Sequence, residues 1–380
     1  YEITTRLVGS EMCIRDRSLV FEGVYQTALV YLNGWLLTRN VNGYAEFTVE
    51  AGPYLKYGAD NLLKVIADNS LEPNSRWYTG SGIYRPVRLL VGNKVYLPQD
   101  TVRITTREAD EGFALLDVTA QVQSASTVTE RVTLQQTICR EGTAVLTDQQ
   151  NLLLQPGESR TVSFRYCVDS PALWSPENPN LYTSTMQVLE GEEELDREET
   201  GFGIRTLSID AAHGVRINGQ TVKLRGACIH HDNGLLGAVC HPDAVRRKVR
   251  ILHENGYNAI RSAHNPCSKA LLDVCDEQGM LVMDEYIDHW YIHKTEHDYV
   301  DYFNDWWRSD LESMVKKDYN HPCVILYSTG NEVSETAQKK GIALTKQLTR
   351  YLHRLDDTRP VTCGVNIFFN FLSSIGFGVY

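Results

Sequence analysis

Four short polar clusters carry residue types that can transfer a proton. Each follows an apolar run, and the clusters read HHDN (230–233), RSAHNP (261–266), DE with DHW (284–285 and 288–290) and GNE (330–332). Histidine and carboxylate side chains are the usual general acids and bases, while asparagine and tryptophan add hydrogen bonds and an apolar face. This combination favours an enzyme that protonates a leaving oxygen.

The apolar runs before these clusters alternate with amphipathic helical stretches. The runs are VKLRGACI (222–229), YNAIRS (257–262), MLVMDE (280–285), CVILYS (323–328) and VTCGVN (361–366), and helices are predicted near 242–254, 267–277, 299–318 and 333–355. Apolar strands in β-α-β-α order indicate a parallel sheet. A spacing of roughly 30 residues per unit predicts a (β/α)8 TIM barrel. Residues 206–380 hold only its first five units. Active sites of such barrels lie at the carboxyl ends of the strands, so the four clusters should meet there.

Two all-β domains are predicted upstream of the barrel. Residues 18–97 carry short β-rich runs, with Asn33-Gly34 as a two-residue hairpin signal. Residues 98–205 hold about seven short strands, which is typical of an immunoglobulin-like β-sandwich. Five of them are the runs TVRITTRE, FALLDVTAQVQ, ERVTLQQTIC, SRTVSFRYCV and LYTSTMQVLE. Residues 1–17 show neither alternation nor helical period and resemble translated sequencing-adapter read-through. We expect them to be a non-native leader outside the fold.

Composition excludes several classes of protein. The chain has 380 residues, 42% of them hydrophobic and 22% charged, which is typical of globular domains. A net charge of -11 disfavours nucleic acid as a partner. No apolar run reaches the roughly 18–20 residues of a membrane span, so no membrane partner is expected. Nine cysteines without a C-x-x-C pair favour a reducing compartment. A cytoplasmic location is therefore favoured, with a periplasmic or secreted protein left open because the chain looks as though it begins mid-protein.

Two competing interpretations concern single motifs. His293-Lys294-Thr295-Glu296-His297 fits the H-x-x-E-H pattern of some zinc peptidases, but it lies in a polar stretch without helical periodicity. Glu332 could also be an ordinary acid in the first turn of the following helix. Tyr302, Trp306 and Trp307 at helical spacing are expected to pack the barrel rather than to bind a ligand.

Six motifs, in order and at their expected spacing, resemble family 2 glycoside hydrolases, the β-galactosidase and β-glucuronidase group. They are RWYTGSGIYRPV, GFGIRT, LRGACIHHDNG, IRSAHNP, VMDEYIDHW and NHPCVILYSTGNE. The resemblance covers about residues 19–380. It implies a jelly-roll sugar-binding domain whose N-terminal part is missing, an immunoglobulin-like domain and a TIM barrel.

The resemblance also implies roles for single residues. Glu332 matches the general acid/base, and Asn331 matches the residue that holds the 2-hydroxyl of the sugar. His264 and His230 match histidines that line the sugar pocket. Asn74 and Arg76 are polar candidates in a loop that the family extends toward the barrel mouth.

The implied activity is that of a retaining exo-β-glycosidase that removes terminal non-reducing β-D-galactose by double displacement. Alternatives are a β-glucuronidase or β-mannosidase of the same family, or a non-catalytic carbohydrate-binding protein. The family nucleophile is a Glu at the end of strand seven, so we expect this chain to be inactive alone. Within this chain, Glu285 is the alternative candidate for the nucleophile. The expected partner is a β-galactoside, and a homo-oligomer of the full-length protein is left open.

No cofactor and no metal site are expected. Some β-galactosidases of the family bind magnesium beside the acid/base through a Glu and a His. The corresponding stretch here, DEYIDHW, lacks the spacing of that pair, although Asp288 and His289 could approach a cation.

Overall fold

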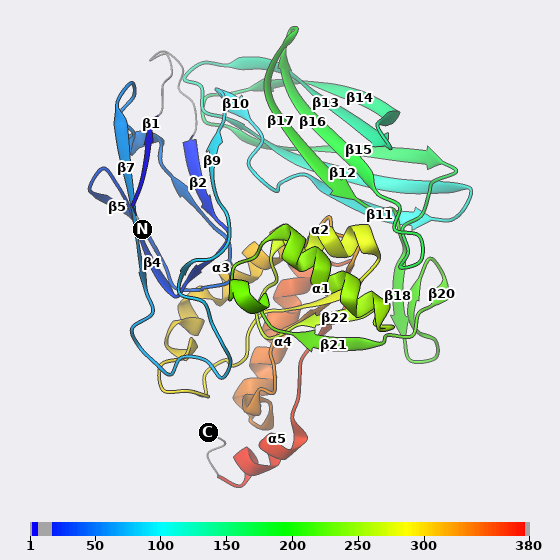
Figure 1. Cartoon of the computed structure of the whole chain (residues 1–380). Coiled ribbons are helices and arrows are strands. Elements are labelled where there is room, and N and C mark those ends of the chain that lie inside the picture. Colours follow the sequence, from blue (N-terminus) through cyan, green and yellow to red (C-terminus); the bar gives the residue numbers. More distant parts are fainter. Residues whose placement is uncertain (1, 7–16, 377–380) are drawn as a thin grey trace.

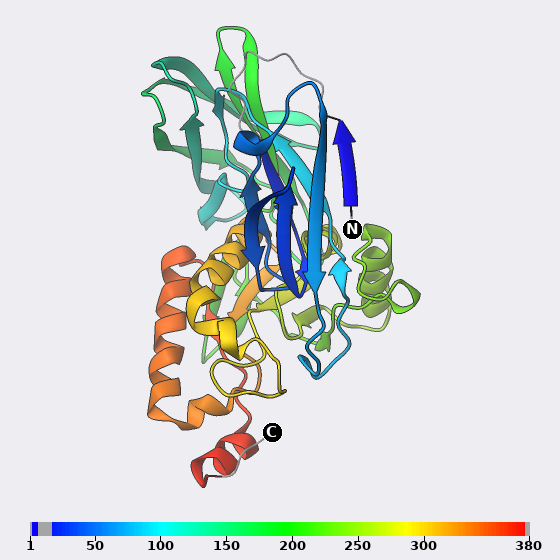
Figure 2. The ribbon, with the colours of Figure 1, turned by 90° about the vertical axis from the view of Figure 1, so that its left-hand side faces the viewer.

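The computed structural model describes residues 2–6 and 17–376 and forms three bodies (Figure 1). Two β-sheet domains lie side by side above an α/β unit that holds the C-terminal part of the chain. Figure 2 shows helices α3 and α4 on the outside of this unit, with α5 projecting below them. Within the described residues, no helix is long and apolar enough to cross a membrane.

The first domain is a sandwich of two antiparallel sheets, ordered β1-β7-β4-β5 and β6-β2-β9, with the short pair β3-β8 beside them. Alternate residues of β4 point into a core that contains Phe21, Val30 and Val65. Asn33 and Gly34 have φ of 52° and 91°, so the predicted two-residue hairpin between β4 and β5 is confirmed. The elements of this domain are β2 (Arg17–Phe21), β3 (Val24–Tyr25), β4 (Thr27–Leu32), β5 (Trp35–Asn40), β6 (Phe47–Glu50), η1 (Gly52–Tyr54), β7 (Asp60–Asp68), β8 (Gly82–Ile83) and β9 (Val87–Val91).

One segment near the N-terminus differs from expectation. We expected residues 1–17 to stand outside the fold, but Glu2–Arg6 forms strand β1 and pairs antiparallel with β7, and Arg17 begins β2. Backbone hydrogen bonds make this pairing, and they need no alternation of side chains. Most of the expected leader, residues 7–16, lies outside the described residues.

The second domain is a β-sandwich of long antiparallel strands. One sheet joins β10, β12, β11 and β15, and the other is ordered β14-β13-β16-β17. Its core includes Leu116, Leu134 and Met186, all fully buried. The predicted strands are present, together with β14 and β17, which the sequence had not singled out. The bounds are β10 (Val95–Tyr96), β11 (Arg103–Ala109), β12 (Phe113–Ser124), β13 (Glu130–Arg140), β14 (Thr143–Leu154), β15 (Ser159–Asp169), β16 (Tyr182–Glu190) and β17 (Glu193–Phe202).

The α/β unit contains the predicted parallel sheet, in the order β21-β22-β23-β24-β25. Its strands are β21 (Gly226–Ile229), β22 (Ala259–Ser262), β23 (Leu281–Glu285), β24 (Val324–Ser328) and β25 (Val361–Thr362). The helices are η2 (Gly234–Leu236), α1 (Pro242–Glu254), α2 (Lys269–Gln278), α3 (Val300–Asp318), η3 (Ser334–Ala337), α4 (Lys339–Leu355) and α5 (Ile367–Ser374). A small antiparallel sheet of β18 (Leu207–Asp210), β19 (Gly214–Ile217) and β20 (Gln220–Thr221) precedes β21. The sheet order and helix positions fit the first five units of a barrel.

Local sequence explains where one of these helices begins and ends. The Ser268 side chain accepts a hydrogen bond from the Leu271 amide and caps the N-terminus of α2. Gly279 ends the helix in the left-handed conformation, at φ 71°. A Cβ at this glycine would lie 2.1 Å from the Pro176 carbonyl oxygen of the second domain. The residue therefore also permits close contact between two domains.

Buried side chains join the β domains to the barrel. Arg205 donates to the carbonyl oxygens of Pro322 and Val324, at 2.6 and 2.8 Å. Trp174, which is fully buried, donates from its indole nitrogen to the Asp276 carbonyl at 2.9 Å. From the first domain, Arg85 donates to the Pro266 carbonyl at 2.9 Å. The Arg85 bond fixes the first domain beside the end of β22, and the bonds of Arg205 and Trp174 hold the second domain against the barrel.

The aromatic residues of α3 have the predicted packing role. Trp307 is buried in the barrel core and meets Tyr351 of α4 edge to face, with ring centroids 5.1 Å apart. Tyr302 and Trp306 are partly buried and pack against the same core.

Candidate active site

The four polar clusters lie at the same end of the parallel sheet, as the sequence predicted. His230 follows β21, His264 follows β22, Glu285 ends β23 and Glu332 follows β24. Parallel pairing of these strands places their carboxyl ends together. The site is therefore built from four consecutive strand ends.

Glu332 sits in a tight turn after β24, with φ of 45°. Backbone hydrogen bonds fix the turn on both sides. The main-chain NH of Asn331 donates to the Ile287 carbonyl at 3.0 Å, and the main-chain NH of Val333 donates to the Gly364 carbonyl at 3.3 Å. The Glu332 side chain is 40% exposed, and its oxygens lie 3.1 Å from Asn366 Nδ2 and 3.8 Å from Arg76 Nη1. Helix α4 begins only at Lys339, so the interpretation of Glu332 as an acid in its first turn is wrong.

Asn331, the neighbour of Glu332, has a fixed orientation. Its side-chain nitrogen Nδ2 donates to Asp288 Oδ1 at 2.7 Å, and its side-chain oxygen Oδ1 accepts from Arg261 Nη2 at 2.8 Å. The residue is 3% exposed. An amide held at both ends cannot flip, so its direction toward a ligand is set before binding.

Glu285 is fully buried under the site. One carboxylate oxygen accepts from Arg261 Nε and Nη2, at 3.1 and 2.6 Å, and from Ser328 Oγ at 2.7 Å. The other oxygen lies 2.7 Å from His264 Nδ1. With 0% of its side chain exposed, Glu285 orients Arg261 and His264 and presents no oxygen to a ligand. This geometry argues against Glu285 as a nucleophile.

His230, His264 and Trp77 form an aromatic cluster at the ends of β21 and β22. The Trp77 ring centroid lies 5.2 Å from that of His230 and 5.1 Å from that of His264, and the two histidine rings are 5.5 Å apart and nearly perpendicular. Burial lowers the pKa of His230, and the neighbouring His264 lowers it further. A neutral His230 can donate or accept a hydrogen bond.

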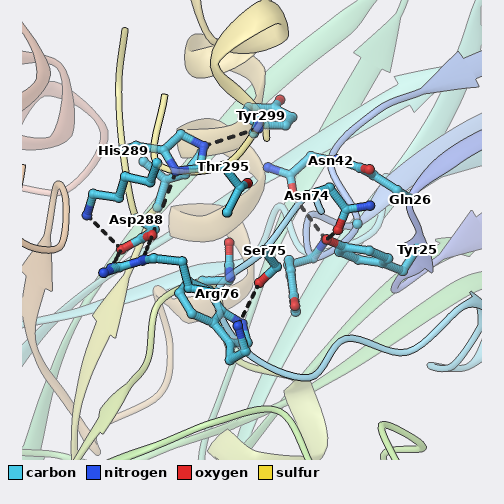
Figure 3. A pocket seen from close by; sticks show the side chains of 16 residues that line it. Tyr25, Gln26, Asn42, Asn74, Ser75, Arg76, Asp288, His289, Thr295 and Tyr299 are labelled. Carbon is cyan, nitrogen blue, oxygen red and sulfur yellow. Dashed lines mark hydrogen bonds and ion pairs between the residues drawn. The ribbon is translucent and has the colours of Figure 1, made fainter. Parts of the chain in front are cut away.

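Arg76 reaches from the first domain to Asp288 of the barrel (Figure 3). Its Nε and Nη2 donate to the two Asp288 oxygens, at 3.2 and 2.8 Å. Lys294 donates from Nζ to Asp288 Oδ1 at 2.9 Å and to the Asn331 carbonyl at 2.7 Å. Burial would raise the pKa of Asp288, but the nearby His289 ring, the charge of Lys294 and the hydrogen bonds from Arg76 outweigh it and hold that pKa well below its usual range.

Asn74 lies close to this pair but turns away from it (Figure 3). Its side-chain oxygen accepts from the Tyr25 hydroxyl at 3.0 Å, and its amide nitrogen donates to Asn69 Oδ1 and the Leu71 carbonyl, at 2.7 and 2.8 Å. These partners all belong to the first domain. Asn74 thus shapes the loop that carries Arg76, and its role as a substrate-binding candidate stays a prediction.

The H-x-x-E-H motif forms no helix. Residues 291–299 are a loop of bends and turns, so His293 and His297 do not share a helical face. His293 Nδ1 lies 2.8 Å from Asp298 Oδ1. The motif contributes Lys294 to the site instead. The sequence did not indicate this role of Lys294 or the role of Arg261. The one feature that could have suggested these two residues is that each follows or ends a strand of the parallel sheet.

One group among the described residues has the spacing of a metal site. Cys267, Asp284 and Asp318 place their ligand atoms within 4.8 Å of one another. Lys317 already donates to all three, with Nζ 3.1 Å from Asp284 Oδ2 and 3.8 Å from Cys267 Sγ. The Lys317 ammonium already lies among these ligand atoms and would repel a metal ion there.

Two family models match the chain. The model of glycosyl hydrolases family 2 matches residues 95–205, and that of the glycosyl hydrolases family 2 TIM barrel domain matches residues 211–379. A β-galactosidase of Bacteroides ovatus is 38% identical over 378 residues, a match that covers 91% of this chain and 44% of that protein.

Solved structures show the same relation. A family 2 glycosyl hydrolase of Bacteroides cellulosilyticus superposes with a TM-score of 0.93 at 36% identity, covering 98% of this chain and 48% of that one. A Bacteroides uniformis β-glucuronidase, covalently bound to cyclophellitol-6-carboxylate aziridine, has a TM-score of 0.86 at 27% identity, covering 97% of this chain and 47% of that one. The chain thus spans about half the length of these relatives. From the order of its domains, the residues at its strand ends and these matches together, the chain belongs to glycoside hydrolase family 2.

Proposed function

We propose that the protein containing this chain is a retaining exo-β-glycosidase that hydrolyses terminal β-galactosides. The observation that carries the proposal is the placement of Glu332. It is the partly exposed carboxylate at the meeting point of the strand ends, and it follows the pre-oriented Asn331. A general acid needs this combination of access to the leaving oxygen and fixed position.

In the proposed mechanism, Glu332 protonates the leaving oxygen while a second carboxylate attacks the anomeric carbon. Glu332 then takes a proton from the water that releases the sugar. Asn331 would hold the 2-hydroxyl group, and His264 and His230 would line the pocket. Because Glu285 is buried and fully engaged, we assign the second carboxylate to the additional length by which the relatives exceed this chain.

The test is the variant Glu332→Gln in the full-length protein, with aryl β-galactosides as substrates. Loss of general acid catalysis should lower kcat/KM by about 10²–10⁴-fold for a poor leaving group, and by much less for a dinitrophenyl leaving group that needs no proton, whereas kcat should fall for both because Glu332 also activates the water. Glu177→Gln, in an exposed turn of the second domain, is the matched control. Unchanged turnover of both substrates by Glu332→Gln would show that the acid/base is another residue. If the full-length protein binds galactosides without turnover, the carbohydrate-binding alternative holds.

One observation favours β-glucuronidase as a second candidate. Arg76 is 27% exposed and lies beside Glu332, so a guanidinium group borders the proposed pocket. Guanidinium groups recognise carboxylates well, and a uronic acid carries one. The ratio of kcat/KM for aryl β-glucuronide and aryl β-galactoside decides between the two, since a ratio above one would favour the glucuronide.

A further inference from the structure

A buried ammonium lies directly behind the proposed acid/base. The Lys294 side chain is 2% exposed and the Asp288 side chain 5%. Lys294 Nζ bridges Asp288 Oδ1 and the Asn331 carbonyl, at 2.9 and 2.7 Å. That carbonyl belongs to the peptide bond that leads into Glu332. The ammonium therefore holds the backbone from which the acid/base projects.

A divalent cation beside Glu332 would have to bind the carboxylate oxygens of Asp288. Asp288 Oδ1 already accepts from Arg76 Nη2 at 2.8 Å, Lys294 Nζ at 2.9 Å and Asn331 Nδ2 at 2.7 Å. Oδ2 accepts from Arg76 Nε at 3.2 Å. An ionised carboxylate oxygen offers about two lone-pair sites, so Oδ1 has none left for a metal. Two cationic side chains would also repel the ion. The residues present do not fit the magnesium that some family members bind there.

The charges around Asp288 also oppose the binding of a metal ion there. Arg76 and Lys294 contribute two positive charges against the single negative charge of Asp288, and His289 is the other titratable group beside that carboxylate, with Nδ1 3.8 Å from Oδ2. Arg76 also faces Glu332, whose Oε2 is 3.8 Å from Arg76 Nη1, so the two cations balance the carboxylates of Asp288 and Glu332. A metal ion at this place would supply a charge of the same sign.

We propose that Lys294, with Arg76, provides the fixed positive charge that positions Asn331 and Glu332, in the place of a divalent cation. Lys294 is thus a positioning residue, and the site forms without metal. The acid/base role of Glu332 in this inference rests on the proposed function, but the ammonium bridge itself can be tested without any turnover.

The first experiment titrates Mn²⁺ into the 380-residue chain and follows free Mn²⁺ by electron paramagnetic resonance. The wild-type chain and Asp288→Asn should give the same curve, because Asp288 Oδ1 is saturated and two cationic side chains flank the carboxylate. One Mn²⁺ per wild-type chain that is lost in Asp288→Asn would overturn the inference. This measurement requires neither sugar binding nor a second carboxylate. It can therefore contradict the inference about Lys294 without contradicting the proposed function.

The second experiment replaces the ammonium. Lys294→Ala should lower the Tm of the chain by about 5 °C, and about 100 mM ethylammonium, which can enter the vacated space and donate hydrogen bonds, should restore at least half of that loss. Tetramethylammonium, which cannot donate, should restore none. Lys346→Ala, at an exposed position on α4, is the matched control. Equal effects of the two ions, or no loss of Tm in Lys294→Ala, would contradict a bridging ammonium.

Discussion

Replacing Glu285 by glutamine should destabilise the barrel strongly. Glu285 is fully buried and binds Arg261, His264 and Ser328. Breaking a buried ion pair by removing one partner costs about 3–5 kcal/mol. Arg261 keeps its bond to Asn331, and 23% of its side chain is exposed to water. We therefore expect the lower end of that range, about 3 kcal/mol.

Thermal unfolding of the 380-residue chain measures this cost. Trp290 and Trp307, two of the six tryptophans, are buried in the barrel core, so tryptophan fluorescence includes a signal from that unit. A loss of about 3 kcal/mol corresponds to a fall in Tm of roughly 6–12 °C for a domain of this size. Glu177→Gln makes the same chemical change at an exposed position and should leave Tm unchanged.

The reasoning fails if Glu285→Gln shifts Tm by less than about 2 °C, since this is below the effect of 1 kcal/mol in a domain of this size. It also fails if the control variant shifts Tm equally. Either result would mean that Arg261 and His264 keep their positions without the carboxylate, and that Glu285 is free for another role.

Two further predictions concern the C-terminal end of helix α2, which carries Asp276 and ends at Gly279. Burial lowers the pKa of His321, but the charge and hydrogen bond of Asp276, 2.5 Å away, raise it overall above 6.5. The stabilisation is therefore complete below about pH 6.5 and lost as pH rises through the raised folded-state value, so the Tm gap between the wild type and His321→Asn should shrink from pH 6 to pH 9. A constant gap would refute the ion pair. Gly279→Ala should cost at least about 2 kcal/mol more than Gly256→Ala in denaturant unfolding. Both glycines have φ above 70°, but only the first would place a Cβ against Pro176, so equal losses would mean that the domain contact yields without cost.

Local patterns in the sequence were sufficient for much of the fold. The hairpin at Asn33-Gly34 and the alternation of apolar strands with helices depend on neighbouring residues, and the structure confirms both. Strand β14 escaped prediction because most of its residues are exposed on both faces, which removes the alternation that marks a strand. Strand β1 is held by backbone pairing, which side-chain periodicity does not encode.

Some residues of the candidate site could be predicted from local sequence, and others become apparent only in the folded chain. Glu332, Asn331 and the histidines could be found because parallel strands bring consecutive strand ends together. The bond between Arg76 and Asp288 joins residues 212 positions apart, so only the assembled domains reveal it. Lys294 was hidden inside a motif of another enzyme class, and its bridging role depends on a backbone carbonyl that has no sequence signature.

The bond between Arg76 and Asp288 also has a consequence for how such proteins diversify. The pocket of Figure 3 is lined by several segments of the first domain, including Asn42 and Arg76, and by the barrel, including Asp288. A recombination event that replaced the first domain by that of a distant relative would remove Arg76 and leave Asp288 with a different neighbour. The two domains are therefore expected to be inherited together, as one evolutionary unit, although each has a hydrophobic core of its own.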